Sequence, residues 1–166
     1  SSFLHRSRFE GSIEFRGVTF SYPGHQQVAL NKVSLKINAG EKVAIIGRVG
    51  SGKSTVQRLM LGLYQPTQGA VLIDGIDSRQ IDPAELRRAI GFVPQDVNLF
   101  YGSLKENIAM GAPFADDQAV LTAAEIAGVS EFANRHPQSL DMAVGERGES
   151  LSGRQRQAAG MARAVL

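Results

Sequence analysis

The sequence of 166 residues contains no cysteine and no tryptophan, and only 6 prolines. Without cysteine the chain can form neither disulfide bonds nor thiolate metal sites, which suits a reducing compartment. No apolar run approaches the roughly 18 residues that a membrane-spanning helix needs. The formal charge of +2 is small and evenly spread, so it gives no reason to expect a nucleic acid as partner.

Apolar residues make up 43% of the chain and charged residues 20%, a balance that excludes both disorder and fibrous repeats. A chain of this length buries about two-thirds of its unfolded surface, so it can form a substantial core. Residues 1–12 carry scattered serines and arginines and are expected to be a linker arm. Strand patterns then dominate as far as residue 95 and helix patterns after it, which predicts an α/β fold.

Several strands are expected in the first half of the chain. Alternating apolar residues predict one over residues 13–20, which Gly17 interrupts as a bulge would. The continuous apolar run at residues 42–46 predicts a strand buried on both faces. Further strands are expected at residues 33–37, 70–73 and 90–93.

Capping patterns mark where helices begin. Asp82 is followed by a proline and then by Glu85, an order typical of a helix N-terminus. Ser103 and Glu106 form the capping-box pattern. Two longer helices are expected at residues 116–128 and 152–166, the second capped by Ser152.

One glycine-rich loop carries the strongest chemical signal. Residues 47–54, GRVGSGKS, match the phosphate-loop pattern G-x-x-x-x-G-K-[ST] at every fixed position, between an expected strand and an expected helix. Glycines let successive backbone N–H groups wrap a phosphate, and the helix N-terminus adds about half a positive charge. The pattern predicts a nucleoside triphosphate site made of Gly47, Arg48, Val49, Gly50, Ser51, Gly52, Lys53, Ser54 and Thr55.

Three side chains of this segment are expected to contact different parts of the nucleotide. Lys53 is expected to reach the β- and γ-phosphates, the Ser54 hydroxyl to bind Mg²⁺, and Thr55 to reach the α-phosphate. The loop does not identify the base. A GTPase would need a guanine-reading N-K-x-D motif, whereas residues 31–34, NKVS, lack the aspartate and precede the loop.

Three further motifs, taken in order, resemble the nucleotide-binding domain of an ATP-binding cassette (ABC) protein. They are FSYP at residues 20–23, FVPQ at 92–95 and LSGRQ at 151–155, and the resemblance extends over residues 13–166. It implies a P-loop ATPase core with an antiparallel β part at the N-terminal side and an inserted helical subdomain at about residues 96–151. Residues 1–12 would then be the linker from a transmembrane part.

The resemblance also assigns roles outside the phosphate loop. Tyr22 corresponds to the aromatic residue that stacks on adenine, and Gln95 to the glutamine that contacts Mg²⁺ and the attacking water. The family signature L-S-G-G-Q contacts the γ-phosphate of an ATP held by a second, head-to-tail copy. Its counterparts here are Leu151, Ser152, Gly153, Arg154 and Gln155. At the fourth position of this signature the sequence has Arg154, where the family usually has glycine. Arginine lacks glycine's backbone freedom and adds a charge.

The segments at residues 100–108 and 144–148 resemble the exporter branch of the family. Residues 47–50, 80–83 and 86–87 are most similar to the ATPases of bacterial type I protein secretion systems. This implies ATP and Mg²⁺ as cofactors and a place at the cytoplasmic face of the bacterial inner membrane. The implied partners are a second nucleotide-binding domain, a transmembrane domain, and an adaptor with an outer-membrane channel.

The family's second acidic motif has no counterpart in these residues. In the family, an apolar strand ending in Asp, then a Glu that polarises water, follows the signature helix, and a later His completes the site. Residues 71–74, VLID, end in an aspartate, but glycine follows and the segment precedes Gln95. We therefore expect a domain cut short after the signature helix, which binds ATP without hydrolysing it efficiently. Two alternatives stay open: a non-hydrolysing regulatory module, and a soluble ABC ATPase of DNA repair or translation.

Overall fold

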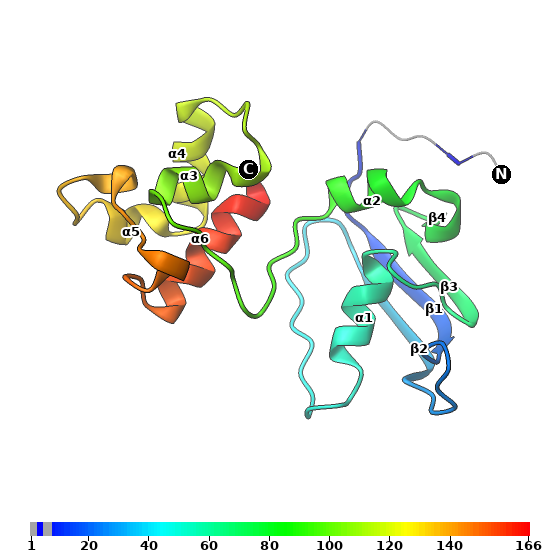
Figure 1. Ribbon diagram of the computed structural model, residues 1–166. Helices are drawn as coiled ribbons and strands as arrows, with labels where there is room; N and C mark the ends of the chain where they lie inside the picture. Colours follow the sequence, from blue (N-terminus) through cyan, green and yellow to red (C-terminus); the bar gives the residue numbers. More distant parts are fainter. Residues whose placement is uncertain (1–2, 5–7) are drawn as a thin grey trace. The chain divides into compact units, whose positions relative to one another are not determined.

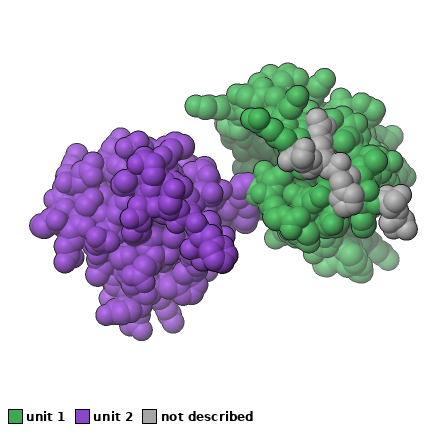
Figure 2. Space-filling view, turned by 90° about the horizontal axis from the view of Figure 1, so that it is seen from above, with its two compact units in different colours: residues 1–90 green, residues 91–166 purple. Residues whose placement is uncertain are grey.

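The computed structural model describes residues 3–4 and 8–166, and the chain divides into two compact units (Figure 1, Figure 2). Unit 1 comprises residues 1–90 and unit 2 residues 91–166. The predicted linker arm at residues 1–12 therefore lies partly outside the described residues. Over the part of the chain that the structure describes, no helix is long and apolar enough to cross a membrane.

Unit 1 is built on a four-stranded antiparallel sheet with the strand order β2-β1-β3-β4 (Figure 1). Its strands are β1 (Ile13–Phe20), β2 (Leu30–Ile37), β3 (Gln68–Ile73) and β4 (Ile76–Asp77). Both pairings of β1 shift register around Gly17, which has a positive φ of 58°. The predicted bulge is thus confirmed, because a glycine in this conformation lets β1 hold one extra residue.

Two helices, α1 (Lys53–Met60) and α2 (Pro83–Ala89), complete the core of unit 1, with a short 3₁₀ helix η1 (Ser78–Gln80) between β4 and α2. α1 contributes Val56 and Leu59, which are buried among apolar side chains of the sheet. Asp82 caps α2 as predicted, because its carboxylate accepts a hydrogen bond from the backbone N–H of Ala84 at 2.8 Å.

Two predicted strands do not form. Residues 42–46 and 90–93 have no strand conformation, and the four-stranded sheet does not include them. Within the first segment, 54% of the surface of Val43 and 93% of that of Ile46 are exposed. A strand exists through backbone hydrogen bonds to a neighbour, and the described residues place no strand beside either segment. The prediction of a buried strand from the apolar run is therefore wrong, because no described strand pairs with this segment.

The turn after β3 fastens the end of the predicted linker arm to the sheet. The carboxylate of Asp74 accepts hydrogen bonds from the backbone N–H groups of Glu10 at 2.6 Å, Gly11 at 2.9 Å and Ser12 at 2.9 Å. Asp74 lies in the turn itself, with a positive φ of 50°. This aspartate, which ends the VLID segment, therefore organises backbone, as expected for a strand and turn.

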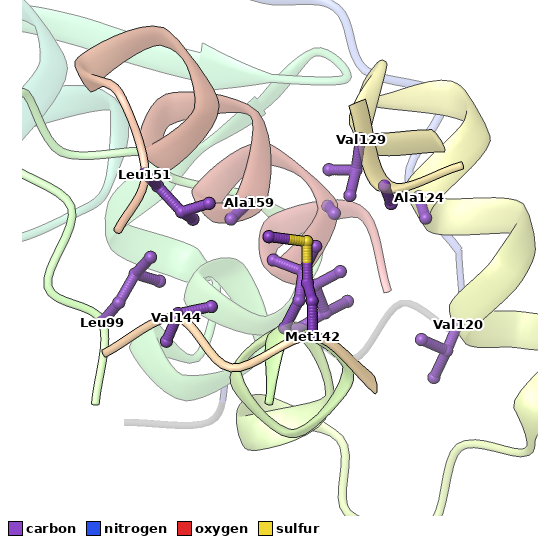
Figure 3. Close-up of a cluster of buried hydrophobic side chains, with 12 residues drawn as sticks. Leu99, Val120, Ala124, Val129, Met142, Val144, Leu151 and Ala159 are labelled. Atoms are coloured by element: carbon purple, nitrogen blue, oxygen red, sulfur yellow. The ribbon is translucent and has the colours of Figure 1, made fainter. Parts of the chain in front are cut away.

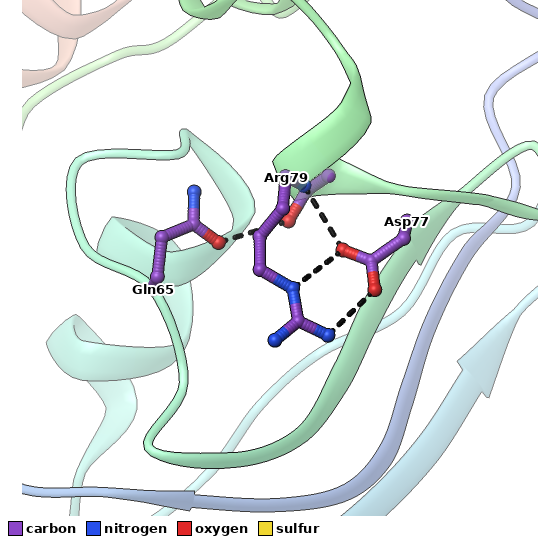
Figure 4. Close-up of polar contacts among 4 residues, drawn as sticks. Gln65, Asp77 and Arg79 are labelled. Atoms are coloured by element: carbon purple, nitrogen blue, oxygen red, sulfur yellow. Dashed lines mark hydrogen bonds and ion pairs between the residues drawn. The ribbon is translucent and has the colours of Figure 1, made fainter. Parts of the chain in front are cut away.

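A carboxylate–guanidinium pair lies at the end of β4 (Figure 4). Asp77 accepts hydrogen bonds from the Arg79 side chain at 3.0 Å and 2.7 Å, and from the Arg79 backbone N–H at 3.0 Å. The side-chain hydrogen bond from Arg79 is the main cause of a lowered pKa of Asp77, and it outweighs partial burial, which raises that pKa. The pair thus favours the ionised carboxylate in the folded state.

The Asp77→Asn variant is expected to lose stability near neutral pH and much less in acid. Because the folded pKa lies below the unfolded value of about 3.9, the carboxylate stabilises the fold above that value. This contribution disappears as the pH falls through the lowered folded pKa. Asparagine still offers an oxygen to the Arg79 backbone, so the cap is retained. Urea unfolding of both proteins from about pH 7 down to about pH 2 measures the effect, and a difference independent of pH would contradict it.

Unit 2 is helical and is organised around a cluster of buried apolar side chains (Figure 3). Its helices are α3 (Leu104–Ile108), α4 (Asp117–Ile126), α5 (Val129–Ala133) and α6 (Gly153–Val165), with the 3₁₀ helices η2 (Ala109–Gly111), η3 (Ser139–Asp141) and η4 (Glu146–Gly148). The capping box of Ser103 and Glu106 forms at α3, and Asp116 caps α4. Unit 2 contains the whole of the expected helical subdomain at residues 96–151, whose boundaries stay a prediction.

Candidate functional site

The phosphate loop lies in unit 1 and leads into the N-terminus of α1. Residues 47–51 are exposed and form turns rather than regular structure. Gly50 and Gly52 have positive φ angles of 81° and 100°. A Cβ atom on Gly52 would lie 2.9 Å from the Leu30 side chain and 3.1 Å from the Ala29 carbonyl oxygen. Both the backbone conformation and the space therefore require glycine where the loop enters the helix.

Lys53, the first residue of α1, folds back over this loop. Its Nζ donates hydrogen bonds to the carbonyl oxygens of Gly47 and Arg48, the latter at 2.7 Å. No described side chain caps the N-terminus of α1, and its first turn contains no acidic residue. The lysine ammonium, the backbone N–H groups of the first turn and the positive end of the helix dipole thus lie together, which is the arrangement that binds phosphate.

Ser54 follows Lys53 and is exposed, whereas Thr55 is buried. Mg²⁺ keeps several waters and typically takes its other ligands from one or two protein groups and substrate phosphates. An exposed hydroxyl beside a phosphate-binding loop fits this chemistry. Among the residues that the structure describes, no group of three or more His, Cys, Asp or Glu could hold a metal ion. A divalent cation held at Ser54 would therefore depend on phosphate oxygens.

The structure places Tyr22 against α1, where it contacts Thr55 and Arg58. The Tyr22 hydroxyl lies 2.8 Å from Thr55 Oγ1 and accepts a hydrogen bond from Arg58 Nη1 at 2.7 Å. Its ring packs edge-on against Phe20 and Tyr64, with centroids 5.0 Å and 5.2 Å away. Tyr22 is thus anchored to the helix that begins at the phosphate loop, and its predicted stacking on adenine stays a prediction.

Gln95 and the signature segment belong to unit 2, where α6 holds the backbone that carries Gln95. The Gln157 amide donates hydrogen bonds to the carbonyl oxygens of Gln95 and, at 3.4 Å, Pro94. Arg163 donates to the Asn98 carbonyl oxygen at 3.0 Å. The chain preceding α3 is therefore fastened along the same helix that begins at the signature.

The signature segment forms the N-terminus of α6. Ser152 Oγ accepts a hydrogen bond from the Gln155 backbone at 3.2 Å, and Gln155 Oε1 accepts one from the Ser152 backbone at 2.9 Å. This capping box confirms Ser152 as the helix cap. Arg154 is exposed and lies within the first turn of α6, so the arginine adopts an ordinary helical backbone. The departure from the family's glycine therefore introduces no unusual backbone conformation here, and the contact of this segment with a second copy's ATP stays a prediction.

The family model described as ABC transporter matches residues 30–166. The chain belongs to the ABC transporter family. A solved structure, of a bacterial Atm1-family ABC exporter with ATP bound, matches 99% of the chain with a TM-score of 0.84 and 39% identity. This match confirms the predicted ABC ATPase fold.

Two curated relatives illustrate the sequence similarity. The chain is 46% identical, over 98% of its length, to "ATP-binding cassette sub-family B member 10, mitochondrial" of Mus musculus. It is also 46% identical, over 94% of its length, to "Cyclolysin secretion/processing ATP-binding protein CyaB" of Bordetella pertussis. The chain spans only 23% and 22% of these relatives, and 28% of the solved exporter chain. The exporter resemblance is confirmed by these matches.

Two residues of these arrangements were not predicted from the sequence. Arg58 and Gln157 lie outside the motifs, on the helices that follow the phosphate loop and the signature. Their roles depend on backbone and side-chain partners that are distant in sequence. Spacing offers one weak signal for Arg58, since it lies three residues after Thr55 and hence on the same face of α1.

Proposed function

We propose that this chain is the ATP-binding part of an ABC exporter motor, with the triphosphate held at the phosphate loop together with Mg²⁺. The observation that carries the proposal is the N-terminus of α1. There Lys53, a helix end without a side-chain cap and the exposed Ser54 come directly before Thr55, whose hydroxyl lies 2.8 Å from that of Tyr22. α1 thus supplies groups for the phosphates, and the segment after β1 supplies an aromatic ring for a planar base.

Each residue of unit 1 has a distinct task in this proposal. When ATP binds, the Lys53 ammonium gives up its hydrogen bonds to loop carbonyl oxygens and donates to β- and γ-phosphate oxygens instead. The backbone N–H groups of the loop enclose the phosphate chain. Ser54 holds Mg²⁺, which neutralises phosphate charge when bound. The Tyr22 ring stacks on adenine, an interaction worth about 1–3 kcal/mol by analogy with nucleic-acid platforms.

Unit 2 supplies the groups that respond to the γ-phosphate. Gln95 would contact the metal and the attacking water, and the signature of a second copy would bind the γ-phosphate, with Ser152 and the N-terminus of α6 as donors. The two copies face head to tail, and ATP favours their closed pairing because it binds that state better. Closure and opening then move a transmembrane domain between its two states.

The proposal also covers the transported cargo and the cellular location of the domain. The similarity to CyaB, whose name describes a secretion and processing protein, supports export of a protein or peptide by type I secretion. The domain would act at the cytoplasmic face of a bacterial inner membrane, with an adaptor and an outer-membrane channel as further partners. A purified adaptor that binds the parent exporter would support this assignment, and export of a lipid or drug alone would contradict it.

The 166 residues by themselves are expected to bind ATP and to release phosphate negligibly, because they contain no counterpart of the family's water-polarising Glu. Retention of radiolabelled ATP measures binding, and phosphate release in the presence of Mg²⁺ measures turnover. Rapid release that disappears in Lys53→Ala would show that these residues suffice for hydrolysis. A folded chain that retains no ATP would overturn the proposal. Tight binding to DNA or ribosomes would instead favour a soluble ABC ATPase.

A further inference from the structure

The Tyr22 hydroxyl joins two residues of α1 that have different predicted tasks. Thr55, expected at the α-phosphate, lies 2.8 Å from this hydroxyl, and Arg58 donates to it at 2.7 Å. Residues three apart on a helix share one face, so both groups reach the same phenol oxygen. A continuous polar path thus runs from Arg58 through Tyr22 to the start of α1.

The donors and acceptors give this path a direction. A guanidinium carries only donors, so the Tyr22 oxygen must accept from Arg58. Accepting from a cation strengthens a hydroxyl as a donor, which favours donation from Tyr22 to Thr55 Oγ1. Thr55 then accepts with its oxygen and keeps its own proton for another acceptor. That proton is free to donate to a phosphate oxygen.

The two partners of the Tyr22 hydroxyl also affect its pKa. Partial burial raises the pKa of the Tyr22 hydroxyl, but the hydrogen bonds with Thr55 and Arg58 and the positive charge of Arg58 outweigh it and lower the pKa. The Arg58 guanidinium carbon also lies 5.6 Å from the centroid of the Tyr22 ring, within cation–π range. Arg58 therefore acts on both the hydroxyl and the ring.

The Tyr22 ring lies at the surface of unit 1. It borders a surface hollow of about 640 Å³, lined by Tyr22, Arg58, Leu63 and Tyr64. Phe20 and Tyr64 pack against the ring at steep angles of 77° and 87°, rather than stacking on its face. The ring is thus fixed by its edge contacts and by its hydroxyl.

We infer that Arg58 is a positioning residue of the nucleotide site, which acts through the Tyr22 hydroxyl to aim the Thr55 O–H at the phosphate chain. The inference rests on the proposed function, because it takes the triphosphate to lie at the N-terminus of α1. It gives a role in nucleotide binding to a residue that lies outside the phosphate-loop motif.

The test compares Arg58→Met, Tyr22→Phe and the double variant by calorimetric titration with MgATP and with tripolyphosphate, which has no base. Each single variant is expected to bind both ligands about 2- to 10-fold more weakly, as expected for the loss of one hydrogen bond. The double variant is expected to bind no more weakly than either single one, because both remove the same path. Arg87→Met, on the exposed surface of α2, is the matched control and should leave both affinities unchanged.

A second readout follows the Tyr22 hydroxyl itself. Titration of the ¹³C-labelled tyrosine ring by NMR should show a higher Tyr22 pKa in Arg58→Met than in the wild type. Additive losses in the double variant, or a loss confined to MgATP, would overturn the relay to Thr55. An unchanged Tyr22 pKa in Arg58→Met would overturn the relay as well. A wild type that binds neither ligand would instead overturn the proposed function.

Discussion

Replacing Gly69 with alanine is expected to destabilise unit 1 by about 2–5 kcal/mol, the sum of a left-handed backbone penalty and an overpacking penalty. Gly69 lies in β3 with a positive φ of 78°. An added Cβ would lie 2.3 Å from the Gly17 carbonyl oxygen and 2.4 Å from the Arg16 carbonyl oxygen. These are backbone atoms of the bulge in β1, so no side chain can rotate away to make room.

Gly75→Ala is the matched control for this effect. Gly75 has nearly the same φ, 76°, but an added Cβ there would meet no atom within 4 Å. It should therefore show only the backbone penalty of about 1–2 kcal/mol. Hydrogen exchange of the β1 and β3 amides measures both losses within unit 1. Equal losses in the two variants would contradict the close approach of β3 to the bulge.

Replacing Lys53 with methionine is expected to weaken MgATP binding by about 10- to 100-fold. Hydrogen bonds to charged groups are worth about 1.5–3 kcal/mol each, and 1.4 kcal/mol corresponds to tenfold in affinity. Methionine keeps an unbranched apolar stem of similar length but cannot donate to a phosphate. Because Lys53 is not part of the buried core cluster, stability should change little. Isothermal titration calorimetry measures the affinity.

Lys42→Met is the control for the loss of a positive charge near this loop. Lys42 is exposed in the irregular segment that precedes the loop. Its replacement should change the affinity only through long-range electrostatics, which salt screens. If both variants weaken binding equally, the effect is one of general charge, and the specific role of Lys53 is wrong.

Local signals in the sequence predicted much of this fold. The capping patterns at Ser103, Asp116 and Ser152 gave helix starts that the structure confirms. These succeed because a cap is made by residues within one turn of one another. The break in alternation at Gly17 predicted a bulge for the same reason, since the backbone freedom of a glycine is a local property.

The failed predictions concern features that depend on distant partners. Residues 42–46 have the composition of a buried strand, yet Ile46 is almost fully exposed. Composition indicates what a segment could bury, whereas a strand also needs a neighbour with which to pair. The bond from Gln157 to the Gln95 carbonyl joins residues 62 positions apart, and no spacing rule predicts it.

The candidate site, too, could be predicted only where its residues are close together in the sequence. The phosphate loop could be predicted because all its groups come from one short segment. The sequence motifs indicated Tyr22 as a base contact but gave no reason to connect it with Thr55 and Arg58. That connection arises because the segment after β1 packs against α1. By contrast, the helical position of Arg154 follows from the predicted cap at Ser152, which is a local signal.

The central claim is that ATP binds at the N-terminus of α1, and chemical-shift mapping of the ¹⁵N-labelled chain during titration with MgATP tests it most directly. Saturable shifts are predicted for the backbone amides of residues 47–55, with further shifts at Tyr22 from the base. Tripolyphosphate should shift the loop amides and leave the backbone amide of Tyr22 largely unchanged. Shifts that do not saturate, or that cluster away from the loop and α1, would contradict the claim.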